Sequence, residues 1–76
     1  MLIQVLGTGC AKCNELEKLV KEVVAEKGSD ATVEKVSDLQ QIAMLGVFTT
    51  PALVIDGAIK AVGGIPNRKD IATWIG

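Results

Sequence analysis

The sequence has no histidine, no tyrosine and only two cysteines among its 76 residues. Two thiolates are half of a tetrahedral zinc site, so a closed zinc site would need ligands from a second chain. No apolar run approaches the roughly 20 residues that a membrane-spanning helix needs. The N-terminus has neither the basic segment nor the small-residue cleavage site of a signal peptide, so we expect a cytoplasmic protein.

Clustered charge of either sign is also missing. Lys and Arg number 8, Asp and Glu number 9, and the net charge is −1. The basic residues never gather as they do on a nucleic-acid-binding surface, and the interspersed charges suit a monomer. Apolar residues make up 49% of the chain, enough for a core, and the length predicts one domain over residues 1–76.

The two cysteines, Cys10 and Cys13, stand close together in the stretch GTGCAKC, residues 7–13. A disulfide between them would close almost no loop, so its gain in chain entropy would be small. Secreted domains that are held by disulfides usually spread their cysteines along the chain. These two cysteines therefore indicate chemistry rather than structural cross-linking.

Hydrophobic patterning predicts seven elements. Apolar runs predict buried strands, and apolar residues at helical spacing predict amphipathic helices. Ser37 with Gln40 looks like the capping box of a short helix. The elements are a strand at 2–6, a helix at 11–27, an edge strand at 31–37, a short helix with Leu39, Ile42 and Leu45 on its apolar face, strands at 52–55 and 58–62, and a helix capped by Asn67 that buries Ile71, Trp74 and Ile75.

This order, βαβαββα, predicts an α/β fold. The helical crossover makes the first two strands parallel, with a right-handed connection. The Asp56-Gly57 pair predicts a type I′ turn, which makes the last two strands antiparallel. The apolar runs place the first and third strands in the middle. We therefore expect a mixed four-stranded sheet in the order 2-1-3-4, with helices on both faces.

The loop before the first helix allows three interpretations, of which phosphate binding is the first. A P-loop would need Gly-Lys followed by Ser or Thr, whereas Lys12 follows Ala11 and precedes Cys13. Without a phosphate, Gly7 and Gly9 serve to let the chain turn sharply from strand into helix.

Metal carriage is the second interpretation, because two soft thiolates suit copper(I). Small copper-carrying domains resemble this chain in placing C-x-x-C between a first strand and a first helix. They usually carry Met where this chain has Thr8, and they end in a strand, whereas this chain ends in a predicted helix. Copper(I) or another soft metal remains the alternative use of the two thiolates.

Dithiol chemistry is the third interpretation. Unpaired N–H groups and the positive end of the helix dipole stabilise a thiolate, the reactive form of cysteine. Cys10, at the start of the helix and facing solvent, is expected to attack, and Cys13, one turn in and more buried, to resolve. Lys12 lies between the two cysteines, and its positive charge would stabilise the thiolate modestly, because salt screens an exposed charge. The alternative is that Lys12 is a solvated helix residue without such a role.

Three motifs together resemble the thioredoxin superfamily: CAKC after the first strand, TTP before the third and GG after the fourth. The resemblance extends from Leu2 to Ile75, and its nearest group is the small thioredoxin-like proteins called redox-active disulfide protein 2, which carry GxGCxxC. It implies a thioredoxin-like fold and the activity of a thiol–disulfide oxidoreductase. Such an enzyme needs no bound cofactor, because the electrons reside in the dithiol.

The resemblance also implies roles for individual residues. Cys10 matches the nucleophile and Cys13 the resolving cysteine. Pro51 matches a cis proline that faces the dithiol, and Thr50 would offer backbone groups to an extended substrate segment. Gly63 and Gly64 match the glutaredoxin glycine pair near the substrate groove, although the end of a strand alone would explain them.

The departures from the family pattern bear on how the dithiol is tuned. Full thioredoxins have Trp before the first cysteine and Gly-Pro between the two, where this chain has Gly9 and Ala11-Lys12. Glutaredoxins usually have C-P-Y-C, so we do not expect glutathione as substrate. Thioredoxins bury an acid beneath the dithiol, whereas the central strands here carry none and Asp56 is expected to be structural. Water or Lys12 would accept the proton of Cys13.

The expected partners are protein disulfides and a disulfide reductase that reopens the Cys10–Cys13 bond, with no nucleic acid and no membrane. A shallow apolar rim from Ala11, Phe48 and Ile65 would receive the protein substrate. A non-catalytic adaptor, by contrast, would keep its function after both cysteines were replaced by serine.

Overall fold

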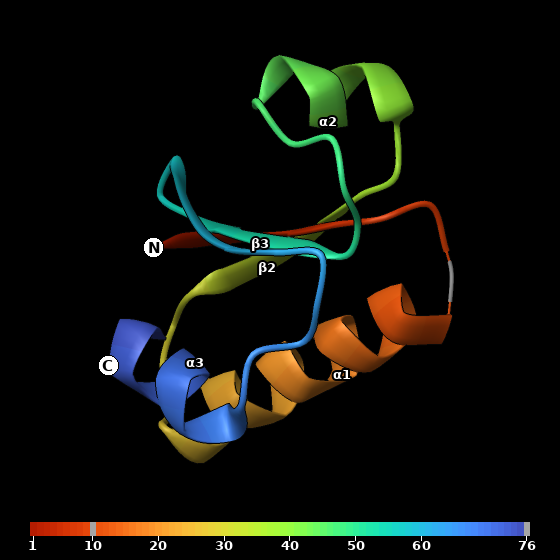
Figure 1. Ribbon diagram of the computed structural model, residues 1–76. Coiled ribbons are helices and arrows are strands. Elements are labelled where there is room, and N and C mark those ends of the chain that lie inside the picture. The colour runs from red at the N-terminus through yellow and green to blue at the C-terminus, as the bar shows by residue number, and fades with distance from the viewer. Residues whose placement is uncertain (10, 76) are drawn as a thin grey trace.

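The computed structural model describes residues 1–9 and 11–75, which form a sheet with helices on both faces (Figure 1). The predicted order of elements and the predicted strand order are confirmed. The elements are β1 (Leu2–Leu6), α1 (Ala11–Glu26), β2 (Thr32–Val36), α2 (Leu39–Met44), β3 (Ala52–Ile55), β4 (Ala58–Val62) and α3 (Arg68–Ile75). No helix within the described residues is long and apolar enough to cross a membrane.

The sheet has the order β2-β1-β3-β4, so the two apolar strands lie in its centre. β1 runs parallel to β2 and antiparallel to β3, and β3 runs antiparallel to β4. Every residue of β3 is buried, as its unbroken apolar run predicts for a central strand. β2 and β4, at the edges, are mostly exposed.

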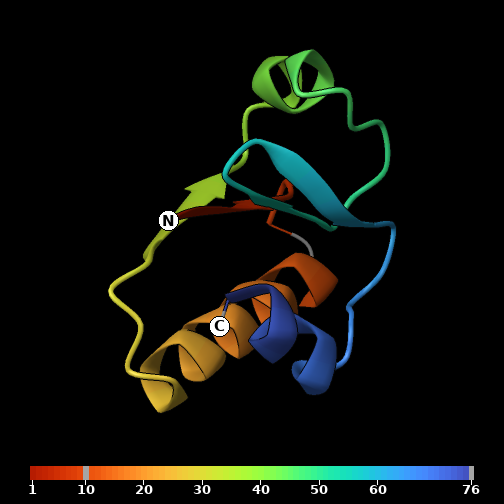
Figure 2. The same cartoon turned by 90° about the vertical axis from the view of Figure 1, so that its left-hand side faces the viewer.

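The larger core lies between the sheet and the pair α1 and α3, which run side by side on one face (Figure 2). Side chains of β1 and β3 that point to this face meet the apolar stripe of α1 and the two buried isoleucines of α3. The buried members are Ile3, Val5, Leu16, Val20, Val23, Leu53, Ile55, Ile71 and Ile75. Trp74 packs against this core while partly exposed, so it is less buried than the sequence predicts.

Of the described elements, α2 alone covers the other face of the sheet, over a smaller core (Figure 2). This core consists of Leu6, Val36, Ile42, Val47, Ala52 and Val54. The predicted apolar face of α2 is only partly right: Ile42 is buried, but Leu39 is 68% exposed and Leu45 is 36% exposed. A helix of six residues has fewer than two turns, so it directs one apolar side chain onto the sheet rather than a full stripe.

The helix caps follow the sequence at α3 and differ from it at α2. Asn67 caps α3 as predicted, its Oδ1 accepting a hydrogen bond from the Asp70 N–H at 2.8 Å. At α2 the prediction of Ser37 was wrong, because Asp38 is the N-cap and its carboxylate accepts from the Gln40 N–H at 2.9 Å. Ser37 and Asp38 both carry a side-chain oxygen that can cap a helix. The structure uses Asp38, so α2 begins one residue later than the spacing of Ser37 and Gln40 predicts.

The Asp56-Gly57 turn ties the β3–β4 hairpin to the start of β1. Both residues have positive φ, 50° and 84°, as a type I′ turn requires. The Asp56 carboxylate accepts a hydrogen bond from the Leu2 N–H at 2.8 Å, and the Asp56 N–H donates to the Leu2 carbonyl at 2.8 Å. Asp56 therefore has the structural role that the sequence predicts.

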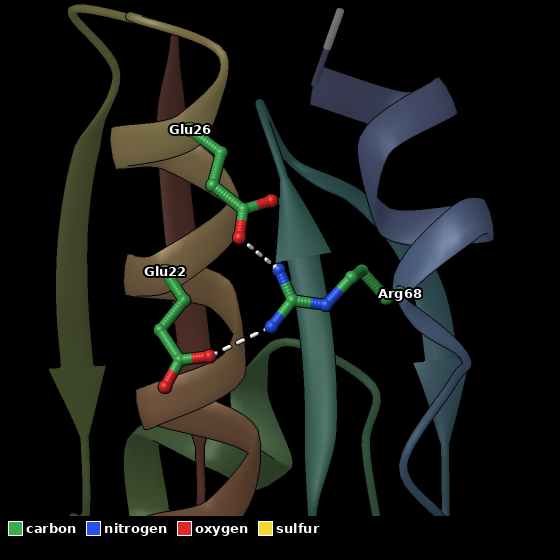
Figure 3. Close-up of polar contacts among 3 residues, drawn as sticks. All are labelled: Glu22, Glu26 and Arg68. Atoms are coloured by element: carbon green, nitrogen blue, oxygen red, sulfur yellow. Dashed lines mark hydrogen bonds and ion pairs between the residues drawn. The ribbon is translucent and has the colours of Figure 1, made fainter.

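Arg68, the first residue of α3, joins α3 to the C-terminal half of α1 (Figure 3). Its Nη1 donates to Glu26 at 2.6 Å and its Nη2 to Glu22 at 2.7 Å. The hydrogen bonds that Arg68 donates to Glu26 and then to Glu22 raise the pKa of Arg68 above its ordinary value. Because a guanidinium is protonated throughout the neutral range, Arg68 keeps its positive charge there.

Candidate active site

Sheet register brings three separate loops to one end of the molecule. Leu6, at the end of β1, pairs with Ala52, at the start of β3, and Ala52 also pairs with Val62, at the end of β4. The residues just beyond these pairs are therefore neighbours across the sheet, since antiparallel strands place the end of one beside the start of the next. Gly7, Pro51 and Gly63 are those residues, each contributed by a different segment.

Cys13 lies in the first turn of α1, and its side chain is fully buried, at 0% exposure. It begins the same buried stripe as Leu16, Val20 and Val23, so the packing of α1 on the sheet holds it in place. The predicted nucleophile, Cys10, lies outside the described residues. The expected burial of the second cysteine is confirmed, while the expected exposure of the first stays a prediction.

Gly7 forms the surface on which Cys13 rests, a role that sequence reasoning missed. Gly7 is buried, and its N–H donates to the Val36 carbonyl at 2.9 Å, which extends the β1–β2 pairing by one residue. A Cβ placed on Gly7 would lie 2.6 Å from the Cys13 Cβ and closer still to its Sγ. The sequence signalled this position only as one glycine of a turn.

The segment before β3 carries the predicted substrate-binding residues. The peptide bond between Thr50 and Pro51 is cis, and Pro51 is buried while Thr50 is half-buried. Gly63 packs against this segment. Its N–H donates a hydrogen bond to the Pro51 carbonyl at 2.8 Å. A Cβ on Gly63 would lie 3.2 Å from the Thr49 Cγ2, which is a tight contact. Gly63 also has a positive φ of 78°, which favours glycine.

The other predicted site residues lie around these segments. Gly9 has a φ of 91° and is exposed, which fits its predicted place in a sharp turn. Ala11 and Lys12 are exposed in the first turn of α1. Gly64 is half-buried, and a Cβ built on it would meet nothing within 4 Å. No tight packing explains the glycine at position 64, in contrast to positions 7 and 63.

A basic residue precedes the first acidic residue of α1, Glu15. The first turn of α1 contains no acidic residue, and it contains Lys12. Asn14 directly follows Cys13, and its side-chain oxygen accepts a hydrogen bond from the Lys35 Nζ of β2 at 3.2 Å. Among residues 1–9 and 11–75 no polar or charged side chain is buried, so this part of the chain holds no buried carboxylate beneath the dithiol.

Exposed apolar side chains border the same loops. Phe48 is 86% exposed just before the Thr49–Pro51 segment, and Ile65 is 36% exposed two residues after Gly63. Together with Ala11 these are the residues that the sequence predicts as an apolar rim. The position of Phe48 and Ile65 beside two hydrogen-bonded loops is consistent with that prediction.

Metal binding gains no support from the described residues. Over residues 1–9 and 11–75, no group of three or more His, Cys, Asp or Glu side chains could hold a metal ion. A two-thiolate copper(I) site would also use Cys10, which this part of the chain does not include. The alternative of copper carriage therefore rests on the spacing of the cysteines alone.

Comparison with known proteins identifies the family. Residues 1–76 match the family described as a thioredoxin domain. The chain is 42% identical over 71 residues to a thioredoxin of Methanothermobacter thermautotrophicus, covering 93% of this chain and 92% of that protein. It is also 42% identical over 71 residues to a thioredoxin of Methanocaldococcus jannaschii, covering 93% of this chain and 81% of that protein. These likenesses support a redox function, and the finer grouping with redox-active disulfide protein 2 stays a prediction. By its fold and by these matches, the chain belongs to the thioredoxin domain family.

Proposed function

We propose that the protein is a thiol–disulfide oxidoreductase that exchanges electrons with protein disulfides through Cys10 and Cys13. The observation that carries the proposal is the buried Cys13 in the first turn of α1, three residues after a second cysteine, in a chain of the thioredoxin family. The 16-residue helix that starts at Ala11 supplies the positive dipole end that favours a thiolate. The absence of acidic residues from its first turn leaves that effect unopposed there.

The reaction has two exchange steps. The Cys10 thiolate attacks one sulfur of a substrate disulfide, a mixed disulfide forms, and the other substrate sulfur leaves as a thiolate. The Cys13 thiolate then attacks the Cys10 sulfur, the Cys10–Cys13 bond forms, and the second substrate sulfur leaves. Two electrons have passed to the substrate, whose thiolates take up protons from solvent. A disulfide reductase reverses the oxidation of the protein, so no bound cofactor is needed.

Substrate docking is assigned to the loops that meet at the same end of the sheet. Thr50 lies two residues before Ala52, the first paired residue of β3, so its backbone groups lie beyond the end of the sheet ladder. A substrate segment in extended conformation would pair there, as in β-strand addition. Phe48 and Ile65 would contact apolar side chains of the partner. The reducing cytosol is the compartment in which such a dithiol is kept available.

The test is a trapping experiment with serine variants. The reduced protein is mixed with a disulfide-bonded protein substrate, quenched with an alkylating agent and analysed by intact mass. Cys10→Ser is expected to abolish reduction. Cys13→Ser is expected to attack normally and to accumulate the mixed disulfide, because no thiol resolves it. Turnover of Cys13→Ser at the wild-type rate would overturn the two-cysteine mechanism.

A redox titration separates the proposal from copper carriage. The metal-free protein is equilibrated in dithiothreitol buffers of graded potential, and its thiols are counted after alkylation. A reversible two-electron step between roughly −200 and −300 mV, the range of glutaredoxins and thioredoxin, is the expected result. The absence of any internal disulfide across that range would reject dithiol exchange.

A further inference from the structure

The contact between Gly7 and Cys13 joins two parts of the molecule that are each fixed independently. Gly7 is held by its hydrogen bond to the Val36 carbonyl at 2.9 Å, as the last paired residue beyond β1. Cys13 is held by α1, whose buried residues Leu16 and Val20 have 0% exposure. Neither partner can move away without disturbing the sheet or the packing of the helix.

The space between the two residues admits no further atom. Carbon atoms in favourable contact lie about 3.5–4.0 Å apart. A Cβ on Gly7 would lie 2.6 Å from the Cys13 Cβ, closer still to the Sγ, and at an ordinary 3.8 Å from the Cα. The overlap therefore falls on the Cys13 side chain, including its reacting sulfur, rather than on the backbone of α1.

We propose that Gly7 is a positioning residue for the resolving step, because its lack of a side chain lets the Cys13 sulfur settle against the end of β1. The inference rests on the proposed dithiol function and deepens it. A methyl group at position 7 would displace the Cys13 sulfur from the line of attack on the Cys10–substrate bond. Displacements of about 1 Å can slow a reaction about 100-fold, so the second exchange should be slowed. The first exchange uses Cys10 alone and should continue.

The kinetic test compares wild type, Gly7→Ala and Thr8→Ala in single-turnover trapping with a disulfide-bonded protein. Thr8 is the exposed neighbour of Gly7 and serves as the matched control. Gly7→Ala is expected to form the mixed disulfide at close to the wild-type rate and to resolve it about 10- to 100-fold more slowly. A general loss of structure would slow both steps together, so the split between them is the diagnostic readout.

A stability cycle keeps the test decisive where Gly7→Ala folds poorly. Cys13→Gly removes both side-chain atoms that the new methyl would meet. Gly7→Ala is therefore expected to lower the urea midpoint in the wild-type background and to have little effect in the Cys13→Gly background. If Gly7→Ala alone does not fold, folding of the Gly7→Ala/Cys13→Gly double variant supports the inference. An equal loss in both backgrounds, or failure of both variants to fold, overturns it.

The outcomes for the inference and for the proposed function are distinct. If wild type resolves the mixed disulfide and Gly7→Ala resolves it equally fast, Gly7 does not position Cys13 and only the inference fails. If Cys13→Ser forms no mixed disulfide at all, the dithiol function fails and the inference about its second step falls with it.

Discussion

At its C-terminal end α1 is tied to α3, whereas at its N-terminal end it carries Cys13 against the bare backbone of Gly7. Two ion pairs from Arg68 and a hydrogen bond from the Lys27 Nζ to the Ala72 carbonyl at 3.1 Å secure the first of these ends. The other end presents exposed Ala11 and Lys12. The difference shows that the two ends of α1 are held differently: polar contacts to α3 hold one end, whereas the other end packs a buried cysteine against the sheet beside exposed residues.

The anchored end should respond most strongly to loss of buried volume. Ile71→Ala, at a fully buried position in the core between α3 and the sheet, should cost about 2–5 kcal/mol of stability. Urea unfolding followed by the fluorescence of Trp74 measures this, with the exposed Thr73→Ala as control. Trapping rates per folded molecule should stay at the wild-type value. A slowed exchange step in folded Ile71→Ala would show that the two ends are not independent.

The reactive end should show a moderate electrostatic effect. Lys12→Gln removes a positive charge from the first turn of α1 and should slow attack on a disulfide about two- to five-fold, the range that charges near a helix end contribute. The difference should shrink in high salt, because Lys12 is exposed. Lys18→Gln, farther along the helix, is the control. Equal rates for wild type and Lys12→Gln would leave Lys12 as a solvated residue.

The smallest effect is expected at Arg68. Arg68→Ala removes both exposed ion pairs and should lower the urea midpoint slightly, with Lys69→Ala as the matched control. The difference should nearly vanish in about 1 M salt, where the Debye length is about 3 Å. A difference that persisted in high salt would assign the stabilisation to packing of the arginine stem instead. Trapping rates should not change.

Much of the fold could be predicted from the sequence because its patterns are local and consistent. The unbroken apolar run of β3, the stripe of α1 and the Asp56-Gly57 turn each have one ready interpretation, and together they determine the strand order. The predictions failed where neighbouring residues compete or an element is short. Asp38 rather than Ser37 caps α2, and Leu39 is exposed because α2 is too short to bury a stripe.

The sequence predicted the burial of Cys13 but not the packing around it, and the catalytic roles of Cys10 and Cys13 stay predictions. The spacing of Cys10 and Cys13 indicated the dithiol, and the burial of Cys13 follows from its place on the apolar stripe of α1. The close contact with Gly7 depends on how α1 sits on the sheet, which no local pattern encodes. The same holds for the bond between Gly63 and Pro51, which strand register brings together.

The packing of α3 on α1 has a consequence for synthesis on the ribosome. β1 and α1 emerge first, yet their core also needs Ile71 and Ile75, which are translated last among the described residues. The core cannot close until α3 has cleared the exit tunnel. Until α3 has emerged, the nascent chain therefore exposes the apolar stripe of α1, including Leu16 and Val20, on which Ile71 and Ile75 pack in the folded protein.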